Sequence, residues 1–300
     1  MAFLHAATSS HSDSKVALRS RGFTPFLLLA PGMLWLITFF IIPIFSLAST
    51  STMVRPDGAP LGQYVQKFRF QNYLDAFQAN QAQYLRSFLY AGIATLLALA
   101  IAYPLAYMIA FRAGRFRNVL LVMVVAPFFT SFLLRTIAWT QILGDDGPVV
   151  SFLKSLPFVT DSLRLTATPF AVVSGLTYNF LPFMTLPLYA SLERIDPRTL
   201  EAAGDLYANA FTTFRKVTVP LSMPGVVAGT LLTFIPAAGD YVNASILGNP
   251  NTKMIGNVIE SRFFAVVDYP TAAALSFTLM ATILILVTLY IRRSGTDELV

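Results

Sequence analysis

Two ionisable side chains stand inside stretches that are otherwise uncharged, and these are the places where the sequence could do chemistry. Arg135 lies within 118–144, and Asp240 lies within 217–252. A charged side chain near the centre of a bilayer costs at least about 2.5–3.5 kcal/mol, so such residues mark either a function or a structural pair. Asp240 could offer an anionic contact to a cationic solute, or it could form an ion pair with Arg135. A cation is a poor ligand for a cation, so a structural role is favoured for Arg135.

Aromatic side chains near these charges could recognise an ammonium group through cation–π contact. Trp139 lies one helical turn after Arg135, so both could face one cavity, and Tyr241 follows Asp240 directly. Packing within a bundle, or a belt of aromatics at the membrane interface, explains each of them as well. Trp139 and Tyr241 join Asp240 as candidates for a substrate pathway. Further aromatic candidates are Tyr103, Tyr107 and Tyr178.

The residue patterns of common catalytic and metal sites are missing from the sequence. There is no cysteine, which excludes disulfides, thiolate metal sites and thiol catalysis. The sequence has neither a Walker A pattern nor GxGxxG nor HExxH. The two histidines, His5 and His11, lie in a polar N-terminal tail with the composition of a disordered segment. We therefore expect no catalytic residue, no metal and no cofactor, and any ATP chemistry must come from a partner.

The composition is that of a membrane protein. Hydrophobic residues make up 55% of the chain, charged residues make up 12%, and the mean hydropathy is +0.63. Soluble domains carry about 25% charged residues. The net charge of +6 would suit nucleic-acid binding, but the basic residues stand at the ends of apolar runs, where they set membrane topology. We therefore expect no nucleic-acid partner.

The apolar runs predict an all-α integral membrane protein with six transmembrane helices. Each run is long enough, because a helix needs about 20 apolar residues to cross the bilayer core. The first run is longer than the roughly 7–15 residues of a signal-peptide core, so we expect it to be retained. Prolines inside the runs bend helices, which suits a cavity-forming bundle that moves. The expected spans are about 24–47, 87–111, 119–143, 169–192, 221–247 and 270–291.

Lysine and arginine predict the orientation, because they concentrate in short cytoplasmic segments. More of them fall inside when both termini are cytoplasmic, so we expect an N-in/C-in topology. The basic residues that this topology puts inside are Lys15, Arg19, Arg21, Arg112, Arg115, Arg117, Arg194, Arg198, Arg215, Lys216, Arg292 and Arg293.

The first outer loop, about 48–86, contains an amphipathic stretch. Phe70, Tyr73, Leu74 and Phe77 fall on one face if this stretch is helical. Packing over the helix ends and docking of a partner are equally compatible with this pattern.

A polar stretch, 201–220, separates the fourth and fifth expected spans. Asp196 followed by Pro197 is a strong helix start, because Asp caps free amides and Pro suits the first helical position. A second helical pattern, FTTFRKV, leads to Pro220 and back into the membrane. An ordinary amphipathic helix at the interface would give the same pattern.

One face of the first of these helices has a distinctive composition. Glu201 and Asp205 are four residues apart and therefore share a face. Ala202 and Ala203 are small and would allow another surface to approach closely. This combination suits a helix that a second protein holds.

The stretch resembles the EAA loop of the inner-membrane permease subunits of bacterial ABC importers. That pattern is EAA, three residues, Gly, nine residues and Ile-x-Leu-Pro; Glu201, Ala202, Ala203 and Pro220 match it at the right spacing. Tyr207 stands where the family has glycine, so we expect the turn to form instead at Asn209 or through Gly204. Val217 and Val219 replace Ile and Leu.

Further segments look like those of polyamine-type permeases. They are 127–147, 220–248, 254–260 and 269–276. The long first outer loop is similar to that of the first permease subunit of spermidine/putrescine importers. Related permeases serve ferric iron, thiamine or phosphonates, which leaves those substrates open. A secondary transporter driven by an ion gradient is the other alternative, although it would not need an EAA loop.

The resemblance implies a mechanism, a location and a set of partners. The helices between spans four and five would be coupling helices in the cytoplasm, with Glu201, Ala202, Ala203, Asp205 and Pro220 engaging an ATPase dimer. The other partners would be a second, homologous permease, an extracytoplasmic substrate-binding protein and membrane lipid, in the bacterial inner membrane. The expected division is a cytoplasmic tail at 1–22, a first helix and outer loop at 23–85, a permease core at 86–292 and a cytoplasmic tail at 293–300.

Overall fold

A computed structural model describes residues 24–157, 159–160 and 162–294. The expected tail at 1–22, with His5 and His11, lies outside the described residues, as does 295–300. The chain divides into two compact units, 1–47 and 48–300.

The described part of the first unit is an apolar helix with one widened turn. It consists of α1 (Thr24–Leu36), the π-helical turn η1 (Ile37–Ile41) and the beginning of α2 (Ile42–Ser51). Pro43 has no amide hydrogen, so the carbonyl four residues before it loses its usual partner, and a π-turn accommodates the gap. The segment Leu28–Ser51 is long and apolar enough to cross a membrane, as the first expected span requires.

Three helices form the centre of the second unit: α4 (Gln81–Phe111), α8 (Pro169–Glu193) and α12 (Met223–Ala238) pack against one another. α4 turns a stripe of alanines inward at intervals of three or four residues. Small side chains on such a stripe let helix backbones approach closely, which is how helices commonly pack in membranes. The fully buried alanines are Ala91, Ala94, Ala98, Ala102 and Ala106.

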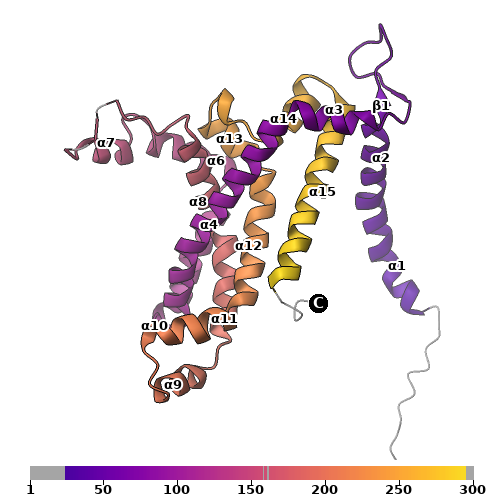
Figure 1. Cartoon of the computed structure of the whole chain (residues 1–300). Helices are drawn as coiled ribbons and strands as arrows, with labels where there is room; N and C mark the ends of the chain where they lie inside the picture. The colour runs from indigo at the N-terminus through magenta and orange to yellow at the C-terminus, as the bar shows by residue number, and fades with distance from the viewer. Residues whose placement is uncertain (1–23, 158, 161, 295–300) are drawn as a thin grey trace, which may run out of the picture. The chain divides into compact units, whose positions relative to one another are not determined.

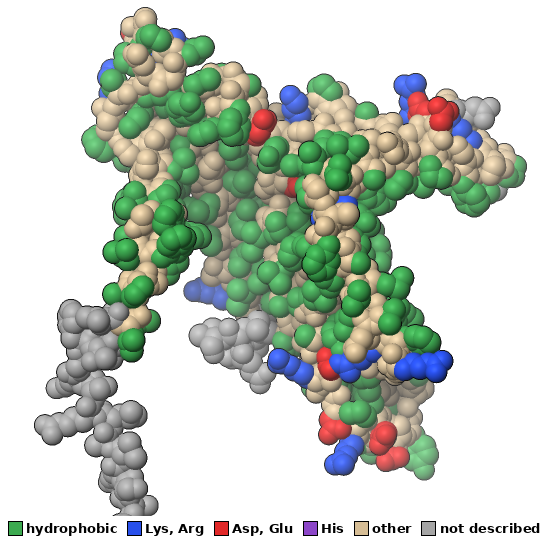
Figure 2. All heavy atoms as spheres, turned by 180° about the vertical axis from the view of Figure 1, so that it is seen from behind, with side chains coloured by type: hydrophobic (Ala, Val, Ile, Leu, Met, Phe, Trp, Pro, Cys, Tyr) green, Lys and Arg blue, Asp and Glu red, His purple; other side chains and the backbone are tan. Residues whose placement is uncertain are grey.

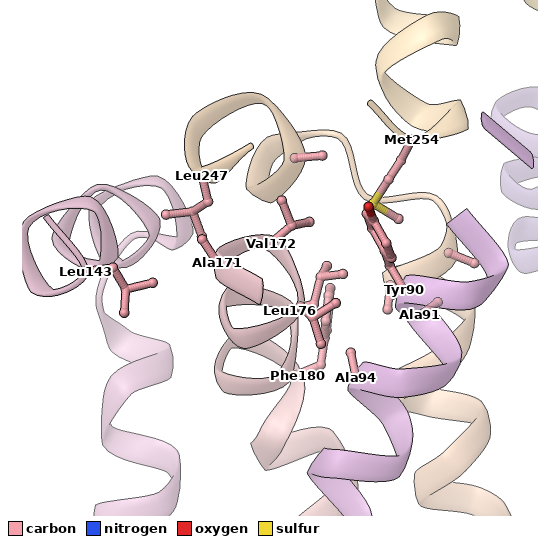
Figure 3. Packing of buried hydrophobic residues seen from close by; sticks show 14 residues of the cluster. Tyr90, Ala91, Ala94, Leu143, Ala171, Val172, Leu176, Phe180, Leu247 and Met254 are labelled. Atoms are coloured by element: carbon pink, nitrogen blue, oxygen red, sulfur yellow. The ribbon is translucent and has the colours of Figure 1, made fainter. Parts of the chain in front are cut away.

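Larger side chains of α8 fill the space beside this stripe. Figure 3 shows Leu176 and Phe180 of α8 facing Ala94 of α4, with Tyr90 one turn before Ala94 and Met254 above Tyr90. All five side chains are buried and belong to one hydrophobic cluster. α4 and α8 are thus joined by apolar packing.

Two glycines let α12 lie directly on α8. A Cβ atom added to Gly225 would stand 2.7 Å from the carbonyl oxygen of Pro187, and one added to Gly229 would stand 2.8 Å from Sδ of Met184. The two glycines are four residues apart, in the sequence GVVAG. This is the GxxxG arrangement that lets helices in membranes approach closely.

The third expected span is not one continuous helix. η2 (Gly114–Phe116), α5 (Arg117–Val125) and η3 (Ala126–Phe129) form its first part, and α6 (Phe132–Ile142) turns away by 96°. Thr130 is extended, with φ −93° and ψ 148°, and its amide and hydroxyl both donate to the carbonyl of Pro127 at 3.2 and 2.6 Å. The prediction of a single helix over 119–143 is therefore wrong, because an apolar run does not reveal a change in backbone direction.

The fifth expected span, 221–247, is also interrupted. α12 ends at Ala238, and a separate helix, α13 (Val242–Leu247), follows the break at 239–241. The segment before α12 is bent by 63° from it. Within the described residues, four helices are long and apolar enough to cross a membrane, or up to six if each bent pair is one span. The fourth of the continuous helices is α15 (Tyr269–Ser294).

Short elements cover one end of the bundle (Figure 1). β1 (Met53–Val54) and β2 (Val65–Gln66) form an antiparallel pair, which an all-α prediction did not include. The amphipathic stretch divides at Asn80 into α3 (Gln71–Ala79) and α4, and α3 packs against α15, as the packing alternative expects. The remaining elements are α7 (Pro148–Lys154), η5 (Pro250–Thr252), α14 (Ile255–Glu260) and η6 (Ser261–Ala265).

Candidate functional site

The loop between α8 and α12 folds into two short helices at one end of the molecule (Figure 1). They are α9 (Pro197–Asp205) and α10 (Ala210–Thr213), followed by η4 (Phe214–Thr218) and α11 (Val219–Leu221). The Asp196 carboxylate accepts the amide of Arg198 at 2.9 Å, so the predicted helix start is confirmed. The Asn209 side chain accepts the amide of Thr212 at 2.8 Å and caps the second helix, whose prediction is also confirmed. Both helices thus begin at capping residues.

The turn between the two helices forms at Tyr207 itself. Tyr207 has φ +59°, whereas Asn209 has φ −71°. The Tyr207 amide donates to the carbonyl of Gly204 at 2.9 Å, and the Ala208 amide donates to that of Ala203 at 3.1 Å. This is a Schellman motif, which normally has glycine at the left-handed position. The prediction that the turn moves to Asn209 or Gly204 is wrong: the helix-end hydrogen bonds hold a tyrosine in a conformation that costs about 1–2 kcal/mol.

The exposed face of α9 carries the acidic residues. Glu201, Asp205 and Ala202 are exposed, and no ion pair within the described residues engages either carboxylate. Ala203 is only 9% exposed and faces the rest of the chain. The expectation that both alanines admit another surface is therefore wrong for Ala203. Pro220, which is exposed, is the second residue of α11.

Phe214 attaches this loop to α4. Its ring meets Tyr103 nearly edge-on, with centroids 5.6 Å apart, and Tyr107 in the same manner at 6.1 Å. The Tyr103 hydroxyl also lies 2.8 Å from Oγ of Ser222, just before α12. Tyr103 and Tyr107, considered from the sequence as ammonium ligands, thus lie beside the loop. Sequence analysis missed Phe214, whose partners are more than a hundred residues away.

An ion pair ties the beginning of α5 to the end of α8. The Arg117 guanidinium pairs with Glu193 and lies 5.1 Å from the centroid of the Tyr189 ring. Glu193 is the last residue of α8, four residues before α9 begins. The chain segments on both sides of the loop are therefore attached to the bundle.

Arg135 lies among aromatic rings. Its guanidinium carbon is 5.2 Å from the centroid of Phe128 and 5.7 Å from that of Phe132. Its Nε and Nη1 atoms are buried without a hydrogen-bond partner. Within the described part of the chain, no ion pair joins Arg135 to Asp240, so the alternative in which the two neutralise each other is not realised.

Asp240 lies in the break between α12 and α13 and caps α13. It is 9% exposed, and its carboxylate accepts the amide of Asn243 at 2.8 Å. α14 crosses this break closely, since a Cβ atom on Gly256 would stand 2.5 Å from the carbonyl oxygen of Gly239. Asp240 therefore has a structural task whether or not it contacts a solute.

A buried polar cluster connects the elements that carry the two charges. Asn179 of α8 donates to Thr136 of α6 at 3.2 Å and to Asn243 of α13 at 3.0 Å. All three residues are at most 1% exposed, and Oδ1 of Asn179 and Nδ2 of Asn243 have no partner. Arg135 and Asp240 are thus linked through their neighbours. No sequence motif marks this cluster.

Trp139 lines a cavity that excludes both charges. Its ring meets that of Tyr178 at 5.5 Å and 62°, beside a cavity of about 320 Å³. The expectation that Arg135 and Trp139 face one cavity is wrong. Tyr241 is 47% exposed, and its carbonyl accepts the side-chain amide of Asn257 at 2.8 Å. The other residues that line the cavity are Leu97, Ile101, Ser174, Thr177 and Leu181.

A more polar cavity of about 400 Å³ lies between the β1–β2 segment and the beginning of α15. The Tyr64 hydroxyl there donates to the carbonyl of Val267 at 2.5 Å, and Val267 has φ +58°. Burial, reinforced by the nearby Asp268 carboxylate, raises the pKa of Tyr64, so its hydroxyl keeps the proton that it donates. In the part of the chain that the structure describes, no group of three acidic or histidine side chains could hold a metal.

Known proteins are similar to this chain in sequence. The family model described as "binding-protein-dependent transport system inner membrane component" matches residues 102–294. The spermidine/putrescine transport system permease protein PotB of Haemophilus influenzae is 38% identical over 259 residues, which cover 86% of this chain and 90% of the relative. PotB of Escherichia coli K12 is 35% identical, with coverages of 87% and 94%.

A solved structure supports the fold. A chain of a bacterial alginate ABC transporter, crystallised with an alginate-bound periplasmic protein, superposes with a TM-score of 0.72. It covers 91% of this chain and 94% of the other, at 17% identity. The resemblance to ABC importer permeases is confirmed: this chain belongs to the family of binding-protein-dependent transport system inner membrane components, which are multi-pass proteins of the bacterial plasma membrane.

Proposed function

We propose that this chain is a permease subunit of an ATP-driven importer and moves polyamines of the spermidine/putrescine class into the cell. The substrate class rests on the PotB relatives, which match nearly the whole chain. The observation that carries the coupling role is the exposed pair of short helices with two free carboxylates between α8 and α12. The chain has no ATPase site of its own in this proposal, so an ATPase dimer supplies the energy.

The proposed topology has six spans with both termini in the cytoplasm. The bent pair Gly114–Phe129 and Phe132–Ile142 then crosses the membrane once, α12 supplies the fifth span, and α9 and α10 lie on the cytoplasmic side. Arg112, Arg115 and Arg117 support this orientation, because they belong to the same end of the bundle as the loop. We retain the division into a first helix with outer loop at 23–85 and a permease core at 86–292. A second, homologous permease and membrane lipid would surround this core.

The coupling surface comprises Glu201, Ala202, Asp205 and Pro220. All four are exposed, which an ATPase groove requires. Ala203 supports this surface from beneath. Its side chain is buried and its carbonyl accepts the amide of Ala208, and both features stabilise the end of α9. Closure of the ATPase dimer would turn α9, and the rings around Phe214 would pass that movement to α4.

The substrate pathway includes the Trp139 cavity and the break at Asp240 and Tyr241. Trp139 and Tyr178 offer ring faces to an ammonium group. Asp240 offers the negative charge, and Arg135 has a structural role among its aromatic neighbours. Delivery by a substrate-binding protein would account for most of the selectivity.

Purification of the intact complex tests this proposal. The solubilised chain should bring down an ATPase and a second permease, and ATP hydrolysis should rise only with a binding protein loaded with putrescine or spermidine. Stimulation by another ligand would keep the importer and discard the polyamine assignment. Purification as a homo-oligomer without an ATPase would favour a secondary transporter instead.

Charge reversal tests the coupling surface. Glu201→Lys should leave the permease folded but abolish substrate import in vesicles. Asp57→Lys is a matched control, because Asp57 is exposed in the β1–β2 loop and undergoes the same charge change. Import by Glu201→Lys vesicles at the wild-type rate would contradict the coupling role of this face.

A further inference from the structure

Part of the first outer loop reaches the joint between α14 and α15. This part, residues 52–70, is named the outer strap, and it is closed at its base, where the Arg69 amide donates to the carbonyl of Thr52 at 2.9 Å. Residues 61–70 are all exposed except Tyr64, which is half-buried. Figure 2 shows hydrophobic and basic side chains on the surface of the strap, at the upper left. Tyr64 is therefore the side chain of this segment that turns inward.

Tyr64 contacts the joint in two ways. Its hydroxyl donates to the carbonyl of Val267 at 2.5 Å, and its ring lies 5.9 Å from that of Tyr269, the first residue of α15. Gly62 of the strap also lies against the joint, since a Cβ atom added to it would stand 3.5 Å from Cγ1 of Val267. Elsewhere the cavity of about 400 Å³ lies between the strap and the beginning of α15. A small number of contacts therefore fastens the strap to the joint.

Val267 has a backbone conformation that its side chain disfavours. Its φ is +58°, and a β-branched residue at such an angle is an outlier that the surrounding structure must hold in place. Within the joint, the Asp268 amide donates to the carbonyl of Arg262 at 2.8 Å, and the side chains of these two residues form an ion pair at 3.3 Å. Tyr64 holds Val267 from the side of the strap. Release of Tyr64 would therefore favour a different backbone conformation at the joint.

The joint lies at one end of a helical rod that crosses the break at Asp240. α14 and η6 follow one another without interruption, so residues 255–265 form this rod. Near its beginning, a Cβ atom added to Gly256 would stand 3.1 Å from the carbonyl oxygen of Asp240. Its other end leads directly into Val267. Asp240 is only 9% exposed in this arrangement, and movement of the rod would uncover it.

We propose that the outer strap is a latch with two states. In the closed state, which the structure describes, Tyr64 is bound to Val267 and the rod is held across the break at Asp240. In the open state the hydrogen bond between Tyr64 and Val267 is broken, Val267 leaves its left-handed conformation, and the rod moves away from the break. The inference rests on the proposed function, in which Asp240 belongs to the substrate pathway. It adds that the latch must open in every cycle of import.

A reversible crosslink tests the latch, because the chain has no cysteine of its own. Gly62→Cys combined with Val267→Cys places two thiols where the strap meets the joint. Oxidation of this variant in vesicles that contain the whole transporter should abolish import, and a reductant should restore it. Met53→Cys combined with Gln66→Cys is the matched control, since these residues are paired between β1 and β2 and their disulfide would lie within the strap. Its import should be the same in the oxidised and the reduced sample.

Two point variants test the latch without a crosslink. Tyr64→Phe removes only the hydroxyl, so amide hydrogen exchange in residues 261–270 should accelerate at least about threefold, which is within the range for the loss of one hydrogen bond. Val267→Gly suits the left-handed conformation, so it should favour the closed state and slow both the exchange and the import. Val266→Gly is the control for Val267→Gly: φ of Val266 is −89°, so glycine relieves nothing there and should slow neither.

The outcomes separate this inference from the proposed function. Import by the wild-type chain tests the proposed function by itself. If a count of free thiols shows the disulfide between positions 62 and 267 to be complete and import continues at the rate of the reduced sample, the latch need not open and the inference is overturned. Failure of these two thiols to form a disulfide would contradict the contact on which the latch depends. Equal exchange in wild type and Tyr64→Phe would mean that the hydroxyl does not hold the joint, which would also overturn the inference.

Discussion

Removal of the Phe214 ring should disconnect the coupling loop from the bundle while leaving the loop able to bind an ATPase. Phe214 makes two edge-on ring contacts, with Tyr103 and Tyr107. Such pairs contribute about 0.5–1.5 kcal/mol each beyond their area burial. Phe214→Ala should therefore weaken the attachment of the loop to α4 by about 1–3 kcal/mol. This shifts the equilibrium between the attached and the detached loop by about 5-fold to 150-fold.

The assay is the ratio of ATP hydrolysed to substrate imported in vesicles that contain the whole transporter. Because the loop of Phe214→Ala keeps its acidic face and its turn, the ATPase should still co-purify. The movements of the loop should no longer reach α4. The ratio of ATP hydrolysed to substrate imported should therefore rise at least about fivefold, the lower limit of the 5-fold to 150-fold range. Phe152→Ala is the control, since Phe152 is 67% exposed and makes no ring pair among the described residues.

Two results would refute this reasoning. An unchanged ratio in Phe214→Ala would mean that the force passes by another route, such as the ion pair between Arg117 and Glu193. Loss of the ATPase from the purified Phe214→Ala complex would mean that the ring shapes the docking surface and does not transmit its movement.

Two further changes test the packing of the bundle and the buried acid. Gly229→Leu should overlap with Met184 and lower the unfolding temperature of the solubilised protein, since overpacking costs about 1–3 kcal/mol. A Cβ atom added to Gly92 meets no atom within 4 Å, so Gly92→Leu is the control and should leave the unfolding temperature unchanged. Equal unfolding temperatures for the two variants would argue against close contact between α12 and α8. Asp240→Asn keeps a cap for Asn243 but removes the charge, so the unfolding temperature should stay near wild type while polyamine uptake falls. Unchanged uptake over a range of polyamine concentrations would confine Asp240 to capping.

Local signals in the sequence predicted the two short helices between α8 and α12. The helix start at Asp196 follows from chemistry within two residues, so sequence alone could identify it. Tyr207 was harder, because the side chain argues against a left-handed turn while the hydrogen bonds to Ala203 and Gly204 require one. The backbone bonds of the helix end prevail over the preference of one residue.

The length of the apolar runs predicted where membrane segments lie but not their shape. Hydropathy does not distinguish a straight helix from one that bends by 96° near Thr130 or stops before Gly239. The partners of Phe214 and Asn179 were also out of reach, because they come from distant parts of the chain. A single sequence contains no direct record of such contacts.

The break at Thr130 has a consequence for the way this protein is made. The segment 114–142 leaves the ribosome before its polar partners do, since Thr136 bonds with Asn179 and Asn243. In lipid, a bent segment is stable only beside protein that satisfies the backbone groups freed at the bend. The segment must therefore enter the bilayer in a provisional state and reach its final bend after α8 and α13 have been synthesised. Truncation of the nascent chain before Asn179 should leave it exposed to membrane quality-control proteases.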